Sequence, residues 1–155
     1  MAMRLRDLEQ ALQRVRPFDT KLQKIDLEQF PTGFHIAARL VQTAAEHDDV
    51  EGRVVVDLGT GTAMLGIGCA LMGAAAVIGL DADLDALAIA AQNIEAAEVD
   101  EVMDLVLCDV SSMPLRSAGL TAVDTVRCPR ALLRIINRSP FTRHLFDFDH
   151  PHETF

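Results

Sequence analysis

The chain has 155 residues, half of them apolar, and a formal net charge of −9. This length suits one domain with a buried core, and no apolar run is long enough to cross a bilayer. The first residues have a charged, helical pattern that a signal peptide lacks. An acidic surface does not by itself attract nucleic acid.

The three cysteines indicate the redox environment. Cys69, Cys108 and Cys128 are scattered, and no pair has the spacing of a zinc site or a redox motif. We therefore expect reduced thiols in a protein of the cytoplasm or nucleus, rather than disulfides.

The composition changes near residue 126. Residues 1–126 contain 9 Lys+Arg and 20 Asp+Glu, whereas residues 127–155 contain 5 Arg and 3 acids, with three of the five His and four of the seven Phe. We interpret residues 1–126 as the folded core and residues 127–155 as an atypical, disordered tail. Its histidines lie in irregular, Phe-rich surroundings, so we expect no metal site.

Helical spacing of apolar residues predicts two helices in the first 50 residues. The first ends near Pro17 and has an apolar stripe made of Leu5, Leu8, Leu12 and Val15. The second is expected to have Thr32 as its N-cap and a buried face made of Ile36, Leu40, Val41 and Ala44.

Strands and helices then alternate. Strands are expected at residues 54–58, 76–80, 105–107 and 123–126. Between them, we expect one helix over residues 63–72 and another capped by Asp83, whose apolar stripe is Leu87, Ala90, Ala91 and Ile94. This alternation predicts an α/β fold with βαβ crossovers and a parallel sheet of about four strands, the fourth at its edge.

A glycine turn follows the first strand. In Asp57-Leu58-Gly59-Thr60-Gly61, the two glycines remove side chains where the backbone must turn sharply and approach a ligand. Such a turn is common in loops of any kind, so by itself it is a weak signal.

Three aspartates strengthen that signal, because each ends one of the first three strands. Asp81 lies 20 residues after Gly61, where an acid accepts hydrogen bonds from ribose hydroxyls. Asp109 could accept from an adenine amine, and Asp57 could orient the turn or reach an ammonium group through water. One such aspartate is usually a helix cap, but three in register with a glycine turn indicate a nucleotide-like ligand.

The ligand need not be a dinucleotide. Met64 stands where a dinucleotide fingerprint has its third glycine, and Asp57 would repel a pyrophosphate. A cationic ligand with an adenosine portion, such as S-adenosylmethionine, fits better.

Several segments resemble the methyltransferase-like protein 5 family. The resemblance covers residues 3–126 and rests on Leu27-Glu28-Gln29-Phe30-Pro31-Thr32, His35-Ile36-Ala37-Ala38-Arg39, Val56-Asp57-Leu58-Gly59-Thr60-Gly61, Gly79-Leu80-Asp81 and Cys108-Asp109-Val110. It implies a Rossmann-like, S-adenosylmethionine-dependent methyltransferase that modifies adenine N6 of small-subunit ribosomal RNA and works with a small activator subunit. It gives no reason to expect a membrane or DNA partner.

The resemblance also implies roles for single residues. Gln29 and Thr32 would contact the methionine part of the cofactor, and Asp81 would hold its ribose. Asp109 and Val110 would hold its adenine. Gly59, Thr62 and Met64 would line the turn beside the cofactor. From the chemistry of the turn given above, we place Asp57 and Gly61 in the same predicted cofactor site.

The chain departs from the family in two places. Ala63 stands where the family has glycine, which is compatible with a helix start. After the fourth strand the family has Asn-Pro-Pro-Phe, which holds and stacks the target base, whereas this chain has Arg127-Cys128-Pro129-Arg130. The similar segment 137–141, Asn-Arg-Ser-Pro-Phe, comes about ten residues too late, and we interpret it as a helix end and a turn.

These departures leave the function open. We expect no catalytic residue in this chain, which would make it a truncated, poorly active methyltransferase. A non-catalytic module that binds the cofactor or the activator subunit is the alternative. An NAD-type oxidoreductase is disfavoured by Asp57 and Met64, and by the absence of an evident hydride-transfer acid.

Overall fold

The computed structural model describes residues 3–18, 32–109, 125–128 and 131–135, the last two ranges by their backbone alone. The helices are α1 (Leu5–Leu12), α2 (Phe34–Glu46), α3 (Met64–Leu71) and α4 (Leu84–Ala96). The strands are β1 (Val54–Leu58), β2 (Ala76–Asp81), β3 (Met103–Leu107), β4 (Thr125–Cys128) and β5 (Ala131–Ile135).

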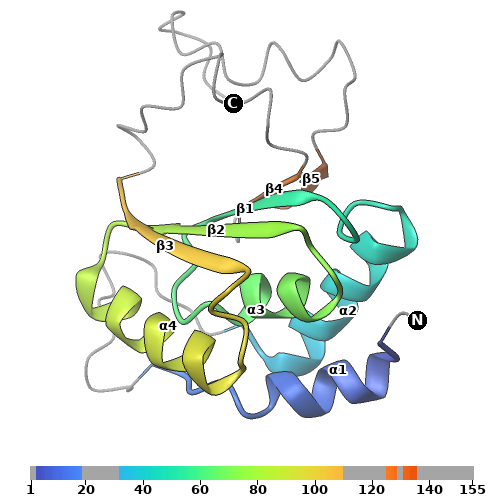
Figure 1. The fold of residues 1–155 in the computed structure, drawn as a ribbon, viewed down its shortest axis with the longest axis horizontal. Helices are drawn as coiled ribbons and strands as arrows, with labels where there is room; N and C mark the ends of the chain where they lie inside the picture. Colours follow the sequence, from blue (N-terminus) through green and yellow to red (C-terminus); the bar gives the residue numbers. More distant parts are fainter. Residues whose placement is uncertain (1–2, 19–31, 110–124, 129–130, 136–155) are drawn as a thin grey trace, which may run out of the picture.

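The strands form one sheet in the order β3-β2-β1-β4-β5. Neighbouring strands are parallel from β3 to β4, and β5 is antiparallel to β4. Figure 1 shows the four helices below this sheet in the view drawn. The predicted α/β architecture with βαβ crossovers is therefore confirmed.

The prediction that the fourth strand forms an edge of the sheet is wrong. β4 pairs with β1 on one side and with β5 on the other, so it is an interior strand of the sheet. The predicted boundary at residue 126 falls inside β4, and β5 lies within the segment interpreted as a tail. The charge shift reflects a change in side-chain composition. Strand pairing depends on backbone N–H and C=O groups, so it can continue past the point where the composition changes.

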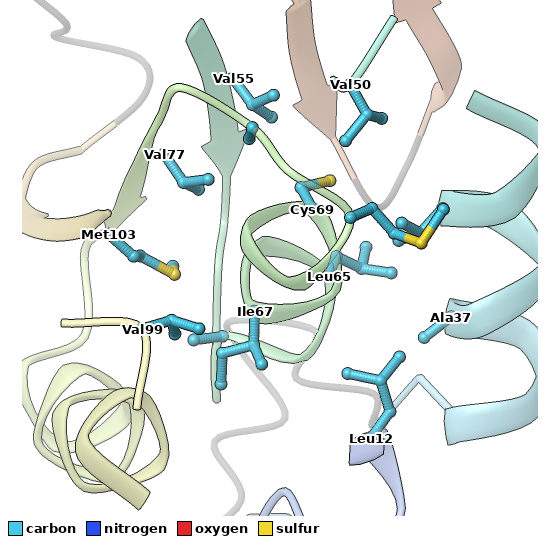
Figure 2. Close-up of a cluster of buried hydrophobic side chains, with 14 of the residues drawn as sticks. Leu12, Ala37, Val50, Val55, Leu65, Ile67, Cys69, Val77, Val99 and Met103 are labelled. Carbon is cyan, nitrogen blue, oxygen red and sulfur yellow. The ribbon is translucent and has the colours of Figure 1, made fainter. Parts of the chain in front are cut away.

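The core lies between the sheet and the helices. Figure 2 shows side chains from α1, α2, α3 and the strands meeting there, among them Leu12, Ala37, Val55 and Ile67. The predicted apolar stripe does face the core, because Leu8 and Leu12 are fully buried and Leu5 is partly buried against them. Val15 is also buried, but it lies beyond the end of α1 at Leu12.

The predicted face of α2 is partly wrong. Ile36 and Leu40 are 61% and 38% exposed, and the alanines at positions 37 and 38 are buried in their place. α2 packs closely on α3, where a Cβ added at Gly68 would lie 2.9 Å from Val41 Cγ2. Close approach of two helices favours small side chains at the contact, so the buried face rotates toward the alanines.

Two smaller expectations also differ. The N-cap of α2 is Gly33, not Thr32, and no side chain caps this helix. On α4, Ala91 is exposed and Asn93 is buried, although Asp83 caps the helix as predicted by accepting from Asp85 N–H. None of the helices in the described ranges is long and apolar enough to span a membrane.

Candidate functional site

The three predicted aspartates lie together at the carboxyl ends of the parallel strands. β2 lies between β1 and β3, and in the register Asp57 pairs with Gly79 and Asp81 pairs with Leu107. Asp109 follows two residues after Leu107 and is exposed. The structure has these aspartates at the carboxyl ends of the strands, as predicted. In α/β folds these ends are where ligands bind.

The glycine turn is fastened to the end of β2. Gly59 and Gly61 both have positive φ angles, 71° and 56°. The N–H groups of Gly59 and Thr60 both donate to the Leu80 carbonyl, at 2.8 and 2.9 Å. The turn therefore lies over β2, at the strand end where Asp81 stands.

Asp81 joins the turn to the start of α4. Its Oδ2 accepts from Gly61 N–H at 2.8 Å, and its Oδ1 accepts from Asp83 N–H at 2.9 Å. Two backbone donors fix the plane of this carboxylate before any ligand arrives. Each ionised oxygen has more than one acceptor site, so both can still accept from the hydroxyls of a ribose.

Asp57 is buried beneath the turn. It is 1% exposed, and its Oδ2 accepts from the Thr60 hydroxyl at 2.9 Å. Of the two roles considered from the sequence, this contact supports the one in which Asp57 orients the turn.

The turn ends in a strained residue. Ala63 is the N-cap of α3 and has a left-handed conformation, with φ 67° and ψ 18°. This region favours glycine and costs an alanine about 1–2 kcal/mol. The sequence showed that glycine is replaced here, but only the backbone shows that the replacement is strained.

Asn93 is a polar contact that the sequence analysis missed. It lies on the buried face of α4, and its amide bonds to Arg16 and to the Thr62 carbonyl. An asparagine at an apolar-stripe position of a helix was the available signal, because a buried amide needs partners.

The remaining candidates are placed less fully. Thr62 is buried, and Thr32 and Met64 are half-buried. Gln29, Val110 and the segment 137–141 lie outside the described residues, as do the three late histidines. The described part of the chain contains no group of three or more His, Cys, Asp or Glu that could hold a metal ion.

The described residues also include cysteine side chains and a hollow. Cys69 is buried and Cys108 directly follows β3, and neither is in a disulfide. A hollow of about 240 Å³ is formed by α1, the end of α3 and the last turns of α4. Asn93 lines this hollow, whereas none of the described residues that the sequence predicted for the cofactor site does.

Comparisons with known proteins agree with this geometry. The family model for ribosomal protein L11 methyltransferase (PrmA) matches residues 27–126. The rRNA N(6)-adenosine-methyltransferase METTL5 of Danio rerio is 42% identical over 72% of this chain and 53% of its own length. Mettl5 of Drosophila melanogaster is 35% identical over 92% of this chain and 73% of its own length.

A solved structure shows the same fold. PH1948 of Pyrococcus horikoshii, a candidate RNA methyltransferase, superimposes with a TM-score of 0.68 at 26% identity, over 95% of this chain and 78% of its own. A parallel sheet with a glycine turn after β1 and acids at the strand ends is thus the Rossmann-like methyltransferase fold.

Within that class, the chain belongs to the METTL5 family of rRNA N6-adenosine methyltransferases. It spans about half the length of the zebrafish relative and 73% of the fly relative.

Proposed function

We propose that this chain binds S-adenosylmethionine at the carboxyl ends of β1, β2 and β3. The observation that carries the proposal is the Asp81 carboxylate, which two backbone donors hold in place beside the glycine turn. A pre-oriented acceptor lowers the cost of ordering on binding, so its hydrogen bonds to the ribose contribute more to affinity.

The charge of the site supports a cationic ligand over NAD. Asp57 is buried directly under the turn, and in a dinucleotide site the pyrophosphate would lie against that turn. A carboxylate repels that group and attracts a sulfonium or ammonium group. Asp109, at the end of β3, would accept from the adenine amine.

The reaction proposed from the family is methylation of adenine N6 in small-subunit ribosomal RNA, with a small activator subunit as partner and a location in the cytoplasm or nucleus. We propose that this chain performs it poorly. Arg127 is the register partner of Asp57, so Arg127-Cys128 continues β4 where the family has the start of Asn-Pro-Pro-Phe.

The connection after β4 supports the same proposal. Only residues 129–130 separate β4 from β5, which leaves little chain to form a base-holding loop beside the cofactor. The second candidate function, a non-catalytic module that binds the cofactor or the activator subunit, is favoured by this observation.

Calorimetry on the full 155-residue chain tests the cofactor. We expect S-adenosylmethionine to bind more tightly than NAD, because of Asp57. Asp81→Asn should weaken binding by about 1–3 kcal/mol through loss of charged hydrogen bonds. Asp104→Asn is the matched control, since it removes the same charge from an exposed position within β3 and should leave the affinity unchanged. Tighter binding of NAD would contradict the proposal.

A further inference from the structure

Asn93 uses its whole side-chain amide in three hydrogen bonds. Its Oδ1 accepts from Arg16 N–H at 2.9 Å, and its Nδ2 donates to Arg16 O at 3.0 Å and to Thr62 O at 2.9 Å. The partners fix the orientation of the amide, because an N–H donor must face Oδ1 and the two carbonyls must face Nδ2. The side chain is 5% exposed, so these bonds have little competition from water.

The bond to Thr62 acts on the strained end of the glycine turn. The Thr62 carbonyl belongs to the peptide group that precedes Ala63, the residue with φ 67°. The N–H of the same peptide group donates to Thr60 O at 2.8 Å. Both polar atoms of this peptide are therefore held, one within the turn and one by Asn93.

The bonds to Arg16 attach a second segment to the same place. Residues 15–18 follow α1, and a Cβ added at Gly61 would lie 3.3 Å from the ring atom Cζ of Phe18. The ring thus packs against the turn while Asn93 holds the backbone two residues earlier. Arg16 Nη1 also donates to Gln92 Oε1 at 3.2 Å, but this contact is exposed.

A strained backbone persists only where its surroundings over-determine it. We propose that Asn93 is a positioning residue of the cofactor site: it holds the Thr62–Ala63 peptide, and with it the glycine turn, in the binding conformation and couples the turn to the segment after α1. This inference rests on the proposed function, because the turn matters through the cofactor that it binds.

Asn93→Asp tests the inference on the full chain. Aspartate keeps the acceptor for Arg16 N–H but turns an oxygen toward two carbonyls. We expect the Kd for S-adenosylmethionine to rise about tenfold or more, a loss of roughly 1.4 kcal/mol. Hydrogen exchange at the Ala63 amide should accelerate. Gln92→Ala, the matched control, removes only the exposed contact of Arg16 and should change the Kd less than about twofold.

Ala63→Gly provides a rescue that a merely structural role would not produce. Glycine adopts the left-handed conformation without strain, so the turn no longer depends on Asn93. In the Ala63→Gly background, Asn93→Asp should raise the Kd only about two- to threefold, a non-additivity that a double-mutant cycle measures.

Three results would overturn the inference. One is a loss of affinity that is equal in both backgrounds. Another is lower stability to urea with the Kd and the Ala63 exchange rate unchanged. The third is an Asn93→Asp chain that does not fold even with Ala63→Gly, since Asn93 would then support the whole domain. If the unsubstituted chain binds no S-adenosylmethionine, the proposed function fails. In that case the role of Asn93 in the turn is still tested by hydrogen exchange at the Ala63 amide and by the unfolding free energies of the same double-mutant cycle.

Discussion

Gly79 lies in β2 beside the side chain of Thr60 in the glycine turn. A Cβ added there would be 2.9 Å from Thr60 Oγ1, 2.9 Å from Leu105 Cδ2 and 3.0 Å from Met103 Cε. Thr60 Oγ1 is the atom that donates to Asp57. A side chain at position 79 would therefore disturb both the packing of the sheet and the conformation of the turn.

Gly79→Ala should therefore harm both stability and binding. We expect the unfolding free energy to fall by about 1–3 kcal/mol from overpacking, and the affinity for S-adenosylmethionine to fall with it. Urea unfolding and calorimetry measure the two effects. Gly33→Ala is the control, because nothing lies within 4 Å of the added Cβ and the cost should stay within about 1 kcal/mol. Equal losses in the two variants would contradict the steric explanation.

Asp49 gives the chain a pH dependence of its own. Burial raises the pKa of this carboxyl above its ordinary value of 3.8, against the lowering effect of His47 and Arg53. The folded state therefore binds the proton more tightly than the unfolded state does. This contribution to stability is present at low pH and is lost as the pH rises through the folded pKa.

Asp49→Asn removes that cost. We expect the variant to be more stable than the unsubstituted chain at pH 7, and the difference to shrink as the pH falls toward the pKa of the folded carboxyl. Thermal unfolding of both chains from pH 7 to pH 4 measures it. A difference that grows on acidification would show that the charged form is the stabilising one.

At the scale of elements, the antiparallel β5 changes how the end of the sheet is understood. It covers the backbone of β4 through pairs that include Thr125 with Ile135 and Cys128 with Ala131. Without β5, the outer side of β4 would present unpaired N–H and C=O groups, as open sheet edges do.

Two deletions separate β5 from the rest of the final segment. Removal of residues 131–155 should lower the unfolding free energy by about 2 kcal/mol or more, because several ladder hydrogen bonds are lost, and should promote aggregation. Removal of residues 136–155 keeps β5 and is the control. Urea unfolding and light scattering compare them. If both deletions behave like the full chain, the pairing of β5 contributes nothing to stability.

At the scale of the whole molecule, the net charge of the chain does not favour RNA binding. Residues 1–126 hold 9 Lys+Arg against 20 Asp+Glu. This part of the chain therefore repels phosphates rather than attracting them. The continuation of β4 through Arg127-Cys128 adds a second obstacle, because a methyl transfer needs the adenine amine placed in line with the sulfonium methyl group.

We therefore expect binding without turnover. A radiolabelled-donor assay should show no transfer to ribosomal RNA or adenine oligonucleotides above background, with or without an added activator subunit. The zebrafish relative named as an rRNA N(6)-adenosine-methyltransferase is the positive control for the assay. Robust formation of N6-methyladenine by the 155-residue chain would refute this expectation and direct attention to residues 137–141.

Much of the fold was predictable because its signals are local. The segment Val54–Leu58 begins with three β-branched valines, and its predicted bounds match β1 without change. The cap at Asp83 and the aspartates at the strand ends were also found, since each depends on a few neighbouring residues and on the rule that parallel strands align their carboxyl ends. Family membership followed from the same local motifs.

Only the tertiary structure decided which face of α2 is buried, where β4 lies in the sheet and how the site is held. Ile36 and Leu40 are exposed because α2 must approach α3 closely, and β4 lies inside the sheet because β5 pairs with it. Asn93 lies 31 positions from Thr62 and 77 from Arg16. A periodic pattern records the geometry of one element, whereas these contacts join elements distant in sequence, and their partners are defined only when the chain is folded.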